Sequence, residues 1–248
     1  MSDAPRGRRA DILLVERGLA TSRTEAQAAI AAGNVRADGK TVAKPAQMLG
    51  EAVELEYEPM HPYVSRGALK LIAALDRFAI SPKGLVCLDL GASTGGFTQV
   101  LLERGADKIY AADVGHGQIH PKLAGDARVV VIEGLNARVL NADHILESPS
   151  LIVVDVSFIS LKLALPSALK LAKPAARLVA LIKPQFEVGR EKVGKGGIVR
   201  DERDRHATLE DISTWLTCEQ RWIVDGTMDS PIAGGDGNRE FFIAAHKS

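Results

Sequence analysis

The stretch LDLGASTGGFTQVLLERGA, residues 88–106, joins a buried strand to a helix through a turn rich in glycine. The apolar strand precedes Gly91, and the helical pattern follows Gly95 and Gly96. Glycine lets a chain turn tightly and lets its backbone approach a bound ligand closely. The stretch therefore predicts an open α/β sheet with a ligand site at the carboxyl end of its first strand.

Helical and apolar segments alternate on both sides of this turn, which is typical of a parallel sheet covered by helices. The Gly/Asp/Asn-rich residues 229–239 indicate a hairpin that makes the last strand antiparallel to the others. Helices are expected at 65–78 and 97–104, between 134 and 151, and between 158 and 178. The seven expected strands are 85–91, 109–114, 129–134, 151–158, 178–184, 221–228 and 240–246.

A smaller α/β module is expected at residues 6–58, joined by a linker at 59–64 to a large domain at 65–248. Two short helices are predicted in it, and the second begins with a capping box formed by Ser22 and Glu25. An Asp38-Gly39 turn indicates a hairpin after these helices. Residues 6–48 hold eight Arg or Lys against four acids. This module could therefore face a polyanion, although an ordinary solvated surface remains the alternative.

Composition excludes several classes of protein. The 248 residues carry no net charge and are 46% hydrophobic, which is typical of a folded globular protein. There is no apolar run long enough to span a bilayer and no signal-peptide core, so a cytoplasmic monomer that does not bind membranes is expected. The two cysteines have no paired spacing, and His116 and His120 lack a third ligand. No metal site is therefore expected.

The acid Asp113 ends the second strand, where a carboxylate can bind ribose hydroxyls. Together with the glycine turn it indicates an adenosine-type cofactor. A nicotinamide enzyme would normally have glycine at the position of Ser93, so that interpretation is weaker.

The segment Gly91 to Gly95 also matches the G-x-S-x-G turn of serine hydrolases. Asp155 and either His206 or His246 could complete such a triad. The hydrolase hypothesis leaves Asp113 and a further strand-end residue, Lys183, without a role.

Charged residues end or begin several of the predicted strands. Asp155 and Lys183 each follow a buried strand, and Glu240 begins the antiparallel one, so all three should meet at the same edge of the sheet. Lys70 lies on the helix before the first strand and by itself would be interpreted as a surface lysine. A lysine near a second cation can lose its proton more easily, whereas carboxylates favour its charged form. The sequence leaves the roles of base and orienting cation open.

Family resemblances give these residues specific roles. The small module resembles the S4 RNA-binding domain, which implies phosphate contacts by Arg9, Arg23, Arg36 and Lys40. The glycine turn resembles the S-adenosylmethionine turn of class I, Rossmann-like methyltransferases, particularly the FtsJ-like ribose 2′-O-methyltransferases. The resemblance implies cofactor contacts by Asp89, Gly91, Ser93, Gly95, Gly96, Phe97, Asp113 and Asn136. It also implies a catalytic tetrad of Lys70, Asp155, Lys183 and Glu240.

The combination of both domains, with YVSRGALKL and KPQFEVGREKVGKGGIVRD at the expected places, resembles the TlyA family over about residues 8–246. The resemblance implies methylation of a cytidine ribose in ribosomal RNA, either free or in a ribosomal subunit. Some members are labelled haemolysins, and a non-catalytic RNA-binding protein is a further alternative. The segment 187–205 is predicted to be a solvated loop that covers the RNA, with Arg190, Lys192 and Lys195 contacting phosphates.

Overall fold

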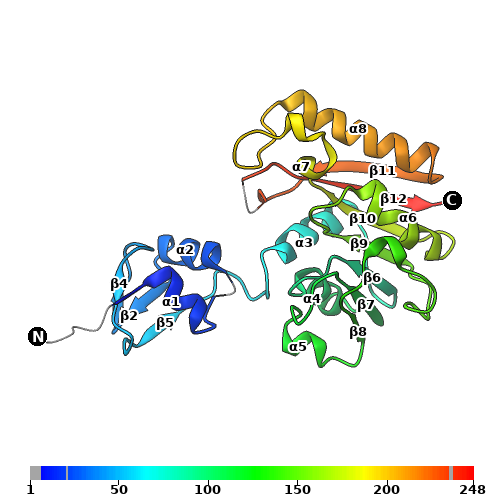
Figure 1. Cartoon of the computed structure of the whole chain (residues 1–248). Helices are drawn as coiled ribbons and strands as arrows, with labels where there is room; N and C mark the ends of the chain where they lie inside the picture. Colours follow the sequence, from blue (N-terminus) through cyan, green and yellow to red (C-terminus); the bar gives the residue numbers. More distant parts are fainter. Residues whose placement is uncertain (1–6, 21, 235–236) are drawn as a thin grey trace, which may run out of the picture. The chain divides into compact units, whose positions relative to one another are not determined.

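The computed structural model describes residues 7–20, 22–234 and 237–248. The chain divides into two compact units, Met1–Tyr63 and Val64–Ser248 (Figure 1). Arg6, the first residue of the expected small domain, lies outside the described residues.

The small unit packs two helices against short antiparallel strands. Helix α2 begins where Oγ of Ser22 accepts a hydrogen bond from the backbone N of Glu25, as the capping box predicted. Asp38 and Gly39 both have positive φ and form the tight turn between β2 and β3. The elements are β1 Arg8–Arg9, α1 Ala10–Glu16, α2 Arg23–Ala31, β2 Val35–Ala37, β3 Lys40–Thr41, β4 Met48–Leu49 and β5 Leu55–Tyr57.

The large unit contains a seven-stranded sheet in the order β11-β12-β10-β9-β6-β7-β8. The pairs among β8, β7, β6, β9 and β10 are parallel, and β12 is antiparallel to both of its neighbours, as the hairpin pattern predicted. The strands are β6 Val86–Leu90, β7 Lys108–Ala112, β8 Val129–Ile132, β9 Leu151–Val154, β10 Arg177–Ile182, β11 Trp222–Asp229 and β12 Phe241–Lys247. The helices are α3 Gly67–Arg77, α4 Gly96–Glu103, α5 Pro121–Ala124, α6 Leu161–Leu171, α7 Pro184–Glu187 and α8 Glu202–Cys218, with short 3-10 turns η1 Ala137–Val139 and η2 Arg190–Lys192.

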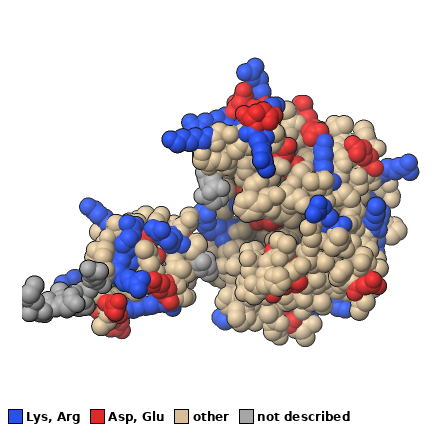
Figure 2. Space-filling view, viewed as in Figure 1, with Lys and Arg blue, Asp and Glu red and all other residues tan. Residues whose placement is uncertain are grey.

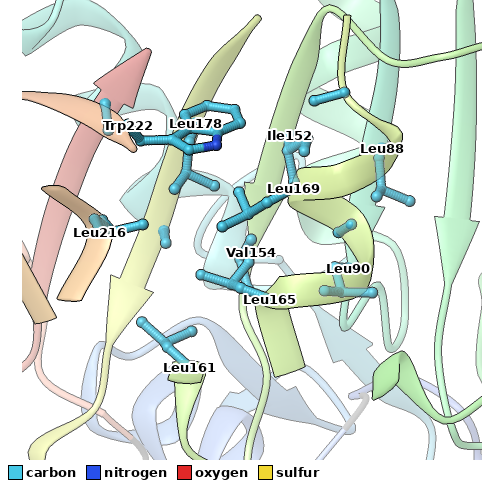
Figure 3. Close-up of a cluster of buried hydrophobic side chains, with 14 of the residues drawn as sticks. Leu88, Leu90, Ile152, Val154, Leu161, Leu165, Leu169, Leu178, Leu216 and Trp222 are labelled. Atoms are coloured by element: carbon cyan, nitrogen blue, oxygen red, sulfur yellow. The ribbon is translucent and has the colours of Figure 1, made fainter. Parts of the chain in front are cut away.

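The sheet is buried between two layers of helices. On one face, leucines of α6 and α8 pack against Leu88, Ile152 and Leu178 of three neighbouring strands (Figure 3). Residues in between point to the other face, where α4 covers the sheet and the Phe97 ring packs against Phe242. Burial of both faces explains why the central strands are continuously apolar.

Two expectations about the large unit are wrong. The helix expected between residues 134 and 151 is only the 3-10 turn η1. The segment 187–205 is not a solvated loop throughout, because its last residues form the first turn of α8 and Val199 is buried. Asp201 begins α8 by accepting a hydrogen bond from N of Arg203. Within the described ranges, no helix is long and apolar enough to cross a membrane.

Candidate active site

The glycine turn between β6 and α4 brings the backbone against the end of β9. Gly91 has a φ of 87°, and a Cβ atom there would lie 2.6 Å from the carbonyl oxygen of Asp155. A Cβ atom on Gly96 would collide with Oγ of Ser65. Glycine is therefore required at position 91, whereas a side chain at position 96 would have to displace Ser65, and the turn has the bare backbone that fits a closely bound cofactor.

Asp113, directly after β7, connects this turn to the next loop. Its Oδ2 accepts a hydrogen bond from N of Ser93 at 2.8 Å, and its Oδ1 accepts one from N of Gly115 at 2.7 Å. Each carboxylate oxygen has a further lone pair. The Asp113 carboxylate is thus held in a fixed position beside the glycine turn and retains the capacity to accept ribose hydroxyls.

Asn136 lies in the loop after β8, close to the end of β7. The preceding residue, Leu135, donates its backbone N–H to the carbonyl of Asp113 at 3.0 Å. Oδ1 of Asn136 accepts a hydrogen bond from N of Arg138, which begins η1. The backbone just before Asn136 is therefore fixed to Asp113, and contact of the Asn136 side chain with a cofactor base stays a prediction.

Asp89 and Phe97 are predicted cofactor residues whose side chains are buried in the protein. Oδ2 of Asp89 accepts a hydrogen bond from Oγ1 of Thr98 on α4, and Oδ1 has no partner among the described residues. Burial raises the pKa of Asp89 to about 7, against the opposing hydrogen bond from Thr98, and the Asp155 charge raises it further. We therefore expect Asp89 to support α4 from inside rather than to contact the cofactor.

Lys183 directly follows β10, and its side chain has two polar partners. Its Nζ lies 2.6 Å from Oδ1 of Asp155 and donates a hydrogen bond to Oγ of Ser157 at 2.8 Å. Asp155 follows β9, the strand next to β10. A carboxylate and a hydroxyl acceptor are the surroundings of an ammonium group.

Lys70 and Glu240 form a second ion pair. Nζ of Lys70 donates to Oε2 of Glu240 at 2.5 Å, and both side chains are buried. A buried lysine remains favourable only when it is paired in this way. Lys70 is therefore not the surface lysine of the simpler interpretation.

Strand register brings the two pairs to one edge of the sheet. Ile182 of β10 pairs with Phe241 of the antiparallel β12, so Lys183 and Glu240 extend from neighbouring ends. Helix α3, which carries Lys70, begins near Asp155: a Cβ atom on Gly67 would lie 3.7 Å from Oδ2 of that residue. The four predicted tetrad residues thus surround the end of the strands where the glycine turn also lies.

Three polar or aromatic residues at this edge have no role in the sequence analysis. Ser157 binds Lys183, as described above. Phe158 has a φ of 64° and is 91% exposed, and its ring centroid lies 5.1 Å from that of Phe186. Buried Asn238 accepts a hydrogen bond from N of Val199 and donates one to the carbonyl of Gly197. The only sequence signal for Ser157 and Phe158 is that they lie two and three residues after Asp155.

The residues predicted to contact RNA lie on both units. Arg9 and Arg23 both bind the carboxylate of Asp11, whereas Arg36 and Lys40 are exposed on β2 and β3. Figure 2 shows Lys and Arg side chains gathered on the visible face of the small unit.

In the large unit, Arg190 and Lys195 are exposed in the segment after Lys183. Lys192 in the same segment forms an ion pair with Asp204 at 2.8 Å.

The hydrolase alternative loses one of its two candidate histidines in this geometry, and the other, His206 on α8, has its ring centroid 6.4 Å from that of Phe241. His246 pairs with Arg177 across β12 and β10, at the edge of the sheet opposite the glycine turn, and its Nδ1 lies 2.7 Å from Asp225. Asp155 is paired with Lys183 rather than with a histidine. No group of three or more potential metal ligands from His, Cys, Asp and Glu occurs in the part of the chain that the structure describes.

Comparisons with known proteins identify both domains. The FtsJ-like methyltransferase model matches residues 63–247, and the S4 domain model matches residues 8–55. The chain is 46% identical over 237 residues to the 16S/23S rRNA (cytidine-2′-O)-methyltransferase TlyA of Mycobacterium tuberculosis. The matched region covers 95% of this chain and 88% of that protein. It is 43% identical over 235 residues to Hemolysin A of Brachyspira hyodysenteriae, covering 94% of this chain and 97% of that one.

A solved structure from Streptococcus thermophilus, which carries a provisional hemolysin name, superimposes with a TM-score of 0.79 at 40% identity, over 99% of this chain and 90% of that chain. The resemblances predicted from the sequence are confirmed at the level of both domains and of the family. The chain belongs to the TlyA family and carries an S4 domain followed by an FtsJ-like methyltransferase domain.

Proposed function

We propose that the protein transfers a methyl group from S-adenosylmethionine to the 2′-oxygen of a cytidine ribose in ribosomal RNA. The observation that carries this proposal is the meeting of the glycine turn with two lysine–carboxylate pairs at one edge of the sheet. The closely related enzyme from Mycobacterium tuberculosis, whose name states this reaction, supports the choice of acceptor.

The cofactor would be held by the turn from Gly91 to Gly96 and by Asp113. The bare backbone of the turn allows close approach, and the fixed Asp113 carboxylate can accept both hydroxyls of a ribose. Asn136 would contact the adenine from the neighbouring loop. Bound there, the cofactor supplies an electrophilic methyl group on a sulfonium.

Lys183 would act on the ribose hydroxyl. Its Nζ donates one hydrogen bond to Ser157 and forms an ion pair with Asp155, and a further N–H bond would point to the 2′-oxygen. As the O–C bond forms and the C–S bond of the sulfonium breaks, the hydroxyl proton would pass to solvent water, and a fixed cation at that place would stabilise the partial negative charge on the oxygen. Most of the remaining acceleration would come from aligning the oxygen with the methyl carbon.

The Lys70–Glu240 pair would support this arrangement from inside. Its two charges balance each other in a buried location, and Glu240 precedes the strand that pairs with β10. The pair therefore fixes the position of the backbone next to Lys183.

RNA would be bound by residues on both units. The exposed ring of Phe158 follows Asp155 and Ser157 and offers a stacking surface for an unpaired base, the usual way in which proteins recognise single-stranded RNA. Phosphate contacts would come from the basic residues named above: Arg9, Arg23, Arg36, Lys40, Arg190, Lys192 and Lys195. A ribosomal substrate would place the protein in the cytoplasm.

The proposal is tested by incubating the full chain with S-adenosylmethionine labelled in the methyl group and with unmodified ribosomal subunits or free rRNA. Digestion to nucleosides and mass spectrometry would identify the product, with Lys183→Met as the inactive control. We expect labelled 2′-O-methylcytidine. Label on a base, or no label in any RNA, would contradict the proposed reaction.

A further inference from the structure

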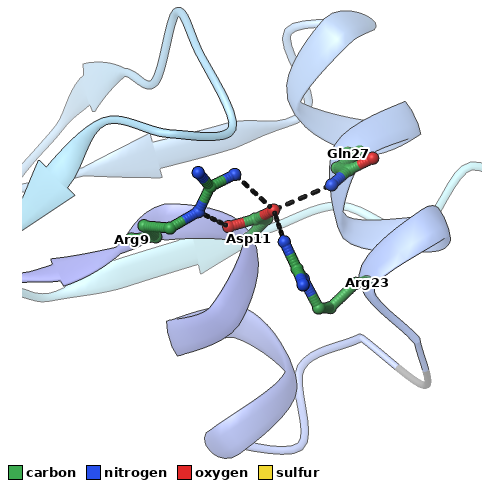
Figure 4. Close-up of polar contacts among 4 residues, drawn as sticks. All are labelled: Arg9, Asp11, Arg23 and Gln27. Atoms are coloured by element: carbon green, nitrogen blue, oxygen red, sulfur yellow. Dashed lines mark hydrogen bonds and ion pairs between the residues drawn. The ribbon is translucent and has the colours of Figure 1, made fainter.

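A buried acid organises the basic surface of the small unit. Asp11, in the first turn of α1, has no exposed surface, yet four hydrogen bonds from three side chains reach its carboxylate (Figure 4). Arg9 donates from Nε to Oδ1 at 2.9 Å and from Nη2 to Oδ2 at 3.0 Å. Arg23 and Gln27, both on α2, donate to the same Oδ2 at 3.0 and 2.8 Å.

The two arginines differ from Asp11 in their exposure. The Arg9 side chain is 39% exposed and the Arg23 side chain is 56% exposed. Each guanidinium group has five N–H bonds in a plane, and Asp11 takes only two from Arg9 and one from Arg23. The buried carboxylate therefore binds two guanidinium groups, and much of each arginine side chain remains in contact with solvent.

The shared oxygen also makes the two guanidinium groups neighbours. Like charges repel at such short range, and long arginine side chains normally occupy many rotamers. The bidentate bond fixes the plane of the Arg9 group, and the negative charge of Asp11 offsets the repulsion. Hydrogen bonds from Arg9, with smaller ones from Gln27 and Arg23, hold the pKa of Asp11 well below its usual range, so the carboxylate stays charged.

Adjacent, preoriented guanidinium groups are suited to phosphate oxygens, which they bind with two parallel hydrogen bonds. We propose that Asp11 is the positioning residue of a two-arginine phosphate clamp, formed by Arg9 and Arg23, that grips the RNA backbone. This inference rests on the proposed function, because it deepens the role of the small unit in RNA binding.

For the change in RNA affinity on substitution of Asp11, the clamp predicts the opposite sign from simple electrostatics. Asp11→Asn removes a negative charge from a basic surface, and charge alone would strengthen the binding of RNA. A positioning role predicts weaker binding, because the uncharged amide has a single acceptor oxygen: it loses the two-oxygen bond to Arg9 and holds Arg23 more weakly. We expect a loss of affinity of about tenfold and a shallower dependence of affinity on salt.

A matched control lies on the same helix. Glu16 also forms an ion pair with an arginine of β1, at 2.7 Å from Nη1 of Arg8, but this pair is exposed. Glu16→Gln removes the same charge without releasing a buried anchor. Its RNA affinity should stay equal to that of the wild type or increase.

The experiment measures the affinity of the full chain for its target rRNA fragment over a range of salt concentrations. The same measurement on Arg9→Ala/Arg23→Ala, with and without Asp11→Asn, tests whether Asp11 acts through the arginines. We expect Asp11→Asn to add no further loss in that background. A loss that persists there, or a folded Asp11→Asn protein that binds RNA at least as tightly as wild type, would overturn the proposal.

Amide exchange of the small unit shows whether Asp11→Asn is folded. If it is not folded, Arg9→Lys tests the clamp instead. This variant keeps the positive charge and leaves Asp11 in place, but lysine lacks the planar guanidinium group. Weaker binding by Arg9→Lys supports the clamp, and unchanged binding contradicts it. If Arg9→Ala/Arg23→Ala binds RNA with the affinity of the wild type, the clamp is refuted. The proposed function is tested separately, by methylation of RNA by the wild-type protein.

Discussion

Glu240→Gln should destabilise the large unit strongly, because it leaves Lys70 buried without a counter-charge. The side chains of Lys70 and Glu240 are 10% and 3% exposed, and the charged atoms lie 2.5 Å apart. At an effective dielectric constant of about 20, the attraction lost is roughly 7 kcal/mol. The glutamine oxygen can still accept a hydrogen bond, so we expect a net loss of about 3–5 kcal/mol in the free energy of unfolding.

Tryptophan fluorescence during urea unfolding reports this loss specifically. The chain has two tryptophans, Trp215 and Trp222, and both are buried in the large unit. Asp76→Asn is the matched control, because Asp76 lies on the same helix as Lys70 and forms an exposed ion pair with Arg104. That substitution should cost less than about 1 kcal/mol.

A double variant separates stability from catalysis. Lys70→Met/Glu240→Leu removes both charges and should recover most of the lost stability, because a buried pair and an apolar pair of similar volume are nearly equivalent. Methyl transfer should remain low, since the backbone next to Lys183 loses its polar support. If Glu240→Gln unfolds at the same urea concentration as the wild type, the pair is not the buried anchor that we describe.

Further substitutions test the remaining parts of the site. Lys183→Met should retain cofactor binding and lower the single-turnover rate by about 100-fold or more, and Lys183→Arg should not restore it, because the guanidinium group has a different shape; a normal rate in either variant would contradict the role of Lys183. Asp113→Ala should weaken cofactor binding by about 1.5–3 kcal/mol in calorimetry, since a charged acceptor is lost. Burial raises the pKa of Asp89 to about 7 in the folded protein. Protonated Asp89 therefore contributes its full stabilisation below the pKa that this residue has in the unfolded chain, and the stabilisation is lost as the pH rises through 7. Asp89→Asn should therefore gain melting temperature relative to wild type as the pH rises from about 4 to about 7, with no further gain above that, whereas a constant difference would refute the shifted pKa. Asn238→Ala should increase proteolytic cleavage near Val199, because both of its hydrogen bonds to that segment are lost; an unchanged cleavage pattern would show that other contacts hold the segment.

The sequence predicted the elements that have strong local signals. The capping box at Ser22, the turn at Asp38 and the glycines of the S-adenosylmethionine-type turn each depend on a few adjacent residues. The antiparallel last strand followed from the hairpin pattern, and it correctly placed Glu240 at the same edge as Lys183.

The pairing of side chains could not be predicted, because it depends on strand register and rotamers. Which lysine binds which acid is decided by residues far apart in the sequence, such as Lys70 and Glu240. Asp11 has the sequence context of an ordinary acid in the first turn of a helix, and only the packing of α1 against α2 shows that it is buried. Helix α8 was not predicted at all, because its first turns are highly charged and apolar periodicity is absent there.

The central claim is that the acceptor is a ribose hydroxyl, and replacement of that hydroxyl tests it most directly. Once the modified cytidine is located, a target RNA with 2′-deoxycytidine at that single position is compared with the all-ribose RNA under single-turnover conditions. The binding of the two RNAs is measured in parallel. We predict equal binding and no methyl transfer to the deoxy substrate. Methyl transfer to the deoxy substrate at the normal rate would mean that the base is the acceptor, which would contradict the account.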